Sequence, residues 1–129
     1  MVMVDSSVWI DMFRRRPTRQ VELLKEFAVD GEACIADLCL FEVLQGVKPE
    51  EAFQRTYEEF GEFRVISVGG EAIAVQAARN AQALRARGIQ PMVVDCLLAT
   101  YCIVNEVRLL TSDLDFEPFA AHLGLILVR

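Results

Sequence analysis

The sequence predicts an α/β fold in one domain, residues 1–129, with a mostly parallel sheet of about five strands. Short apolar runs alternate with longer segments of helical periodicity, and this alternation is typical of parallel sheets with right-handed crossovers. The 129 residues match the commonest size of a single domain, and 53% of them are hydrophobic, which is enough for a packed core. No internal repeat or long linker divides the chain.

The N-terminal half is expected to form two strands and four helices. Pro17 stops the first helix, and Thr18 is a favourable N-cap for the second. Asp30-Gly31 favours a turn, and Asp37 is interpreted as the N-cap of the helix that follows the second strand. The expected elements are a strand over Val2–Val4, helices over Val8–Phe13 and from Thr18 to about Val29, a strand over Ala33–Ala36, a helix from Asp37 to Leu44, and a helix over Pro49–Phe63.

The C-terminal half is expected to form three further strands and three helices. Gly69-Gly70 leads into a long helix, and Gly88 is interpreted as the glycine that ends it. The helix after that carries Asp95 in its first turn. The expected elements are a strand over Arg64–Val68, helices over Glu71–Arg87 and Met92–Asn105, a strand over Arg108–Thr111, a short helical segment over Asp113–His122, and a last strand over Gly124–Val128.

We expect a cytoplasmic protein without a membrane segment. No apolar run reaches the roughly 18 residues of a membrane helix, and the N-terminus meets Asp5 without the basic region of a secretion signal. His122, the only histidine, is expected on the surface, so Ser6 and Ser7 lack a histidine partner for nucleophilic catalysis. The four cysteines form no CxxC pair and are interpreted as buried, reduced thiols: Cys34, Cys39, Cys96 and Cys102.

The net charge of −6 does not by itself indicate a nucleic-acid partner, because such proteins usually present a basic surface. The distribution of the charges nevertheless allows RNA binding, because the chain has two runs of basic residues. These runs either form solvated faces or contact phosphates. These runs are Arg14, Arg15, Arg16 and Arg19, and Arg79, Arg85 and Arg87. Acids around a divalent cation are also partly neutralised and need not repel a phosphate chain.

Isolated acids occur at corresponding places in several elements. Asp5 follows the first predicted strand and Asp113 the fourth, at the carboxyl edge where parallel sheets bind ligands. Glu42 and Asp95 have apolar neighbours on two helices whose ends can open onto the same edge. Each acid alone also has a structural explanation, because aspartates cap helices and occupy turns. Taken together, these acids favour a functional site.

Crowded carboxylates repel one another, and burying them without partners is costly. A bound cation resolves the conflict, and hard oxygen ligands with no histidine or thiolate nearby select Mg²⁺ or Mn²⁺ over zinc. Such an ion lowers the pKa of a bound water and neutralises charge on a phosphoryl group. The residues therefore predict phosphodiester hydrolysis at a site with one or two ions. Its expected members are Asp5, Glu42, Asp95 and Asp113.

Four motifs, in order, resemble those of the PIN-domain ribonucleases, and specifically the VapC toxins of toxin–antitoxin pairs. They are VMVDSSVWIDMF around Asp5, CLFEVLQGV around Glu42, VVDCLLATYC around Asp95 and LLTSDLDFEPF around Asp113. The resemblance covers nearly the whole chain and implies a three-layer α/β/α fold. Asp115, in the last motif, is left open as a contributor, and Thr100 departs from the second small residue that many relatives carry.

The resemblance also implies roles and partners. Ser7 and Thr111 match positions that support the carboxylates through hydrogen bonds. The family implies a homodimer, dependence on Mg²⁺ or Mn²⁺, cleavage of RNA, and a VapB-type antitoxin whose C-terminal segment lies in an apolar groove and blocks the acidic site. Five apolar residues near the N-terminal helices either line such a groove or belong to the core. They are Trp9, Ile10, Met12, Phe13 and Phe53.

Two other kinds of protein also carry acids on a scaffold of this type. A receiver domain also gathers acids at the edge of a sheet, but it needs a lysine late in the chain, and the only lysines are Lys25 and Lys48. A binding module that keeps the PIN scaffold without activity is the alternative to the ribonuclease, and the retained set of acids argues against it.

Overall fold

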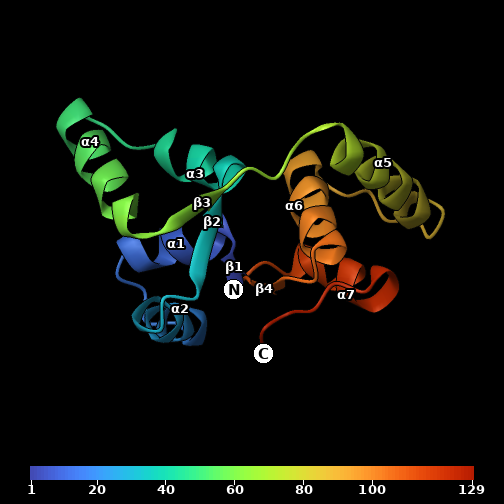
Figure 1. The fold of residues 1–129 in the computed structure, drawn as a ribbon, viewed down its shortest axis with the longest axis horizontal. Helices are drawn as coiled ribbons and strands as arrows, with labels where there is room; N and C mark the ends of the chain where they lie inside the picture. The colour runs from blue at the N-terminus through green and yellow to red at the C-terminus, as the bar shows by residue number, and fades with distance from the viewer.

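Four short strands form a parallel sheet in the order β3-β2-β1-β4 (Figure 1). The structure is a computed structural model that describes residues 1–129. Every residue of β1 and β2 is buried, which explains why these strands are apolar throughout instead of alternating. The strands are β1 (Val2–Val4), β2 (Ala33–Ala36), β3 (Arg64–Ile66) and β4 (Arg108–Leu110).

Seven α-helices flank the sheet, in keeping with the predicted layered α/β architecture. In Figure 1, α1 to α4 lie to the left of β1, and α5 to α7 lie to its right. The helices are α1 (Ser6–Phe13), α2 (Arg19–Val29), α3 (Asp37–Leu44), α4 (Glu50–Glu59), α5 (Glu71–Arg85), α6 (Val93–Val104) and α7 (Glu117–Leu123), with short 3₁₀ helices η1 (Phe60–Glu62) and η2 (Leu114–Phe116). None of them is long and apolar enough to cross a membrane.

Two predicted helix ends are confirmed. The hydroxyl of Thr18 accepts a hydrogen bond from the N–H of Val21 at 3.1 Å and caps α2. Gly88, at φ 80°, follows the end of α5 in the left-handed conformation that glycine adopts without strain. The N–H of Ile89 donates back to the carbonyl of Leu84 at 2.9 Å, which closes that end of the helix.

The sheet has four strands, one fewer than the predicted number of about five. The segment Gly124–Val128 makes a single parallel bridge, between Leu109 and Leu127. The start of this segment is held by α7 instead, because the N–H of Leu125 donates to the carbonyl of Phe119 at 3.2 Å. Only the end of the segment therefore reaches β4.

The prediction that Asp37 is an N-cap was also wrong. Helix α3 begins at Asp37 itself, and the capping position is taken by Ala36. The Oδ1 of Asp37 accepts hydrogen bonds from the N–H of Leu38 at 2.8 Å and from the N–H of Val68 at 3.3 Å. Asp37 therefore ties the start of α3 to the segment that follows β3.

Trp9 belongs to the hydrophobic core and not to an exposed groove. Its indole N–H donates to the carbonyl of Val4 at 3.1 Å, and its ring packs edgewise against Phe60 and Phe63. The four cysteines are buried and unpaired, and His122 is exposed, as predicted.

Thr100, the departure from the family pattern, has a structural partner. It is fully buried between α5 and α6, where its hydroxyl oxygen accepts a hydrogen bond from the side chain of Asn80 at 3.0 Å. The side-chain carbonyl of Asn80 in turn accepts from Gln76 at 3.0 Å. Since both buried polar groups are satisfied, a hydroxyl at position 100 is accommodated in the core.

Candidate metal centre

The register of the sheet brings the first and last acidic motifs together. Strands β1 and β4 pair so that Val4 lies opposite Leu110, and the N–H of Asp5 donates to the carbonyl of Leu110 at 2.9 Å. Asp5 and Asp113 therefore leave the same edge of the sheet from neighbouring strands. Both begin a helical turn, since Asp5 is the N-cap of α1 and Asp113 is the N-cap of η2.

The carboxylate of Asp5 is buried and heavily hydrogen-bonded. Its Oδ2 accepts from the hydroxyl of Ser7 at 2.7 Å and from the hydroxyl of Thr111 at 2.9 Å. These are the two supporting residues expected from the sequence. They are themselves held by backbone groups, because the N–H of Ser112 donates to Ser7 and the N–H of Asp113 donates to Thr111.

Glu42 lies on α3 and joins Asp5 to form the first acidic group. Its Oε1 accepts a hydrogen bond from the hydroxyl of Ser6 at 3.0 Å. Ligand atoms of Asp5, Glu42 and Cys39 all lie within 4.8 Å of one another. The sequence interpretation treated Cys39 as a core thiol and Ser6 as an uninvolved hydroxyl. The spacing of Cys39 and Glu42, three positions apart on one helix face, was the available signal for the thiol.

The second acidic group consists of Asp95, Asp113 and Asp115. Ligand atoms of these three side chains lie within 4.8 Å of one another. Asp95 is in the first turn of α6, as predicted, and no donor is bonded to its side chain. The Oδ1 of Asp113 accepts from the N–H of Asp115 at 2.8 Å. Asp115, which the sequence left open, therefore lies with two of the predicted residues.

The two groups act on each other electrostatically. Burial, reinforced by the negative charges of Asp5, Asp113, Glu42 and Asp115, raises the pKa of Asp95 to about 7. Burial likewise raises the pKa of Asp5, although the hydrogen bonds from Ser7 and Thr111 offset part of the effect. Burial also raises the pKa of Glu42, and the bond from Ser6 opposes this. All four predicted acids therefore belong to one electrostatic centre.

The family model of the PIN domain matches residues 2–121. The chain belongs to the PIN domain family. PIN domains are generally nucleases. No curated protein sequence matches this chain, so its relationships come from the family model and from solved structures.

Solved structures of bacterial proteins share the fold of this PIN domain. VapBC2 from Rickettsia felis, solved with a DNA fragment of its promoter, is 19% identical with a TM-score of 0.80 and covers 99% of this chain and 98% of its own. FitAcB from Neisseria gonorrhoeae is 16% identical with a TM-score of 0.78 and covers 100% and 97%. DNA-bound VapBC from Salmonella typhimurium is 15% identical with a TM-score of 0.74 and covers 99% and 98%.

The acidic centre of this PIN domain fits a hard divalent cation. The salt bridges of the chain use Asp11, Glu22, Glu32 and Glu117, and none reaches the five acids of the centre. Several neighbouring carboxylates thus lack a counter-charge, and a cation supplies one. Burial raises the pKa of the Cys39 thiol well above its usual range, so the thiol is neutral in the absence of a metal ion. The remaining oxygen donors are those that Mg²⁺ and Mn²⁺ prefer.

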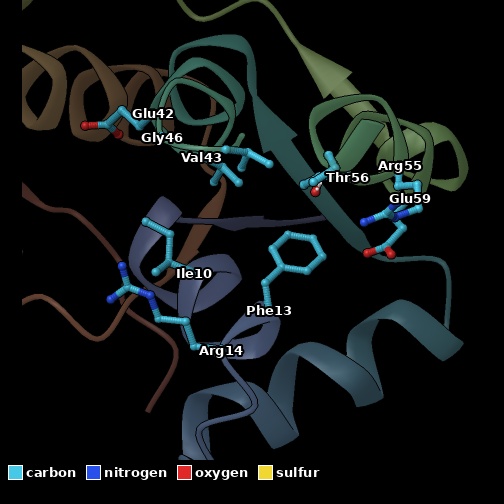
Figure 2. A pocket seen from close by; sticks show the side chains of 11 residues that line it. Ile10, Phe13, Arg14, Glu42, Val43, Gly46, Arg55, Thr56 and Glu59 are labelled. Carbon is cyan, nitrogen blue, oxygen red and sulfur yellow. Dashed lines mark hydrogen bonds between the residues drawn. The ribbon is translucent and has the colours of Figure 1, made fainter. Parts of the chain in front are cut away.

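A groove of about 480 Å³ adjoins the centre, between α1, α3 and α4 (Figure 2). Two of the five residues predicted to line a groove, Ile10 and Phe13, line this one. Met12 and Phe53 do not, and Trp9 is in the core. Apolar side chains lie between charged ones at either end. The apolar residues labelled are Ile10, Phe13 and Val43, and the labelled charged ones are Glu42 and Arg14 at one end and Arg55 and Glu59 at the other.

Proposed function

We propose that this PIN domain is a Mg²⁺- or Mn²⁺-dependent endoribonuclease and the toxin of a VapC-type toxin–antitoxin pair. The observation that carries the proposal is the gathering of five carboxylates, without a cationic partner, at the carboxyl edge of the sheet. Membership of the PIN family and the likeness in fold to VapBC structures support it. An enzyme of this kind acts on cellular RNA, so we propose the cytoplasm as its location and residues 1–129 as one domain.

In this proposal Asp5, Glu42, Asp95 and Asp113 hold the cation through carboxylate oxygens. When bound, such a cation lowers the pKa of a water and neutralises negative charge that develops on the phosphate. The protein orients the Asp5 carboxylate, because the hydroxyls of Ser7 and Thr111 donate hydrogen bonds to its Oδ2 at 2.7 and 2.9 Å. Asp95 contributes by charge, because it gives up its proton near pH 7 and the resulting carboxylate attracts the cation.

The groove supports a role in binding a partner. We propose that the C-terminal segment of a VapB-type antitoxin lies there, because apolar side chains form its middle and it reaches Glu42 at one end. A homodimer of the toxin is part of the same proposal.

The partner proposal is tested with the product of the adjacent upstream gene. We expect Phe13→Asp to weaken co-purification of that product at least about 10-fold, since it buries a charge in the groove. Val29→Asp is the control, because Val29 is 87% exposed on α2 and lies outside the groove. Equal retention of the partner by both variants would contradict the groove assignment.

The nuclease proposal is tested by neutralising one carboxylate at a time. Asp5→Asn removes the charge but keeps a side chain that caps α1, so the fold is expected to persist. We expect Asp5→Asn and Asp95→Asn each to reduce RNA cleavage at least about 100-fold, because each removes a ligand of the cation. Asp30→Asn, at the exposed end of α2, is the matched control. Cleavage is measured with Mn²⁺, with Mg²⁺ and with EDTA, on RNA and on DNA of the same sequence.

Full cleavage by a folded Asp5→Asn protein, or cleavage that persists in EDTA, would contradict the nuclease proposal. An inactive binding module on the PIN scaffold is the alternative. Calorimetry separates the two, because the module predicts no binding of Mn²⁺ at millimolar concentrations. Sequencing of the RNA ends that accumulate after induced expression identifies the substrate.

A further inference from the structure

Ser6 joins the two carboxylates of the first acidic group. It is the first residue of α1, and its hydroxyl donates to Oε1 of Glu42 at 3.0 Å across 36 positions of sequence. The same oxygen lies 3.5 Å from Oδ1 of Asp5. A hydroxyl has one proton to donate, so the shorter contact, to Glu42, is the stronger one.

The hydrogen bonds leave one oxygen of each carboxylate available. In Asp5, Oδ2 receives the hydroxyls of Ser7 and Thr111, and Oδ1 has only the long contact with Ser6. In Glu42, Oε1 receives Ser6, and Oε2 has no hydrogen-bond partner. Oδ1 of Asp5 and Oε2 of Glu42 therefore keep the largest number of free lone pairs for a cation.

Glu42 depends on Ser6 more than Asp5 depends on any one donor. A glutamate has a longer and more mobile side chain than an aspartate, and ordering it for binding costs conformational entropy. Ser6 is the only hydrogen-bond donor to the Glu42 carboxylate, whereas Asp5 has two short hydroxyl donors. Loss of one hydroxyl therefore frees Glu42 but leaves Asp5 largely held.

We propose that Ser6 is a positioning residue that orients Glu42, so that the hydroxyl holds Oε1 and Oε2 would be free to bind the cation. This inference rests on the proposed function, because it assumes that Glu42 is a ligand. Ser6 acts through Glu42 and does not itself bind the cation. Hydrogen bonds that orient metal ligands commonly contribute 10- to 100-fold to the affinity for the metal.

The test is calorimetric titration of the RNA-free protein with Mn²⁺. We expect Ser6→Ala to bind Mn²⁺ about 10-fold more weakly than the wild type. Ser6→Thr, which keeps the hydroxyl, is expected to restore binding to within about 3-fold. Ser67→Ala is the matched control, because Ser67 is exposed and lies outside both acidic groups. Alanine is the better helix former, so Ser6→Ala is expected to fold, which a thermal melt verifies.

A double-mutant cycle separates orientation of Glu42 from a general effect on the start of α1. In a Glu42→Gln background, Ser6→Ala is expected to change the Mn²⁺ affinity by less than about 2-fold. An equal loss in both backgrounds would overturn the inference, as would wild-type affinity in Ser6→Ala. In those two cases the wild type still binds Mn²⁺ and Asp5→Asn does not, so the proposed function stands. A wild-type protein that binds no Mn²⁺ would overturn both.

Discussion

The two acidic groups of the centre hold their carboxylates in different ways. In the first, Asp5 and Glu42 receive hydroxyl donors, and these donors fix the orientation of both side chains. In the second, the only bond is the backbone one from Asp115 to Asp113, and Asp95 has no donor. The first group is therefore organised before a cation binds, whereas the second is a cluster of negative charge that a cation would organise.

This difference follows from where the chain supplies its donors. Asp5 is followed directly by Ser6 and Ser7 at the start of α1, and the β1–β4 register adds Thr111 from across the sheet. Asp95 is flanked on α6 by Val94 and Cys96, neither of which offers a strong donor to a carboxylate. The first group thus provides carboxylates of fixed orientation, and the second group provides negative charge.

The largest effect is expected from removing the hydroxyl donors of the first group. The double variant Ser7→Ala/Thr111→Val leaves the Asp5 carboxylate buried without its two shortest hydrogen bonds. We expect a 10- to 100-fold loss of Mn²⁺ affinity and a loss of about 1–3 kcal/mol in the free energy of unfolding. Titration calorimetry and urea unfolding measure the two quantities.

The control for that variant is Thr56→Val, because the Thr56 hydroxyl bonds only to the carbonyl of Ala52 in α4. If the double variant matched this control in both measurements, the hydroxyls would not organise the first group, and the contrast between the groups would fail.

A smaller effect, on stability, is expected from the charge of the second group. The pKa of Asp95 is about 7 in the folded protein, against the ordinary aspartate pKa of 3.8 in the unfolded chain, so folding takes up a proton between these pH values. The free energy of unfolding without metal should therefore fall as pH rises toward 7 and level off above it. Since Asp95 is partly exposed, we expect a change of only about 1–2 kcal/mol.

Urea unfolding in EDTA at a series of pH values measures this slope. Asp95→Asn is expected to make this slope shallower and to be the more stable protein above pH 7, and the raised pKa values of Asp5 and Glu42 account for the slope that is left. Asp30→Asn, at the exposed end of α2, is the control. Stability that rises with pH from 5 to 7 in the wild type would show that burial and the neighbouring charges do not raise the pKa of Asp95 in the folded protein.

The sequence was a good guide to what short-range patterns determine. The alternation of apolar runs and helical segments predicted the parallel sheet, and the position of each acid relative to a strand end predicted the acidic edge. The failures concern contacts that the local pattern of apolar and polar residues does not show. Gly124–Val128 has the pattern of a strand, but the bond from Leu125 to α7 limits its pairing to one bridge.

The same reason explains which members of the candidate site were missed. Ser7 and Thr111 were expected because they match polar positions of known motifs, and their bonds to Asp5 are present. The bond from Ser6 to Glu42 joins two helices that are separated by 36 positions, and no local pattern records it. The burial of Trp9 depends likewise on Phe60 and Phe63, which are distant in sequence.

The smallest effect is expected from Asp115, the exposed member of the second group. Asp115 lies close to Asp95 and Asp113 but is the last of the four charges in its effect on the pKa of Asp95. Its backbone N–H, which holds Asp113, is retained in any substitution. We therefore expect Asp115→Asn to weaken Mn²⁺ binding only about 2- to 5-fold, the size of a screened charge effect of below 1 kcal/mol. Titration calorimetry measures the Mn²⁺ affinity of Asp115→Asn and of Asp113→Asn, and the two losses are compared. An equal loss of affinity in the two variants would make Asp115 a full ligand and the second group a three-carboxylate site.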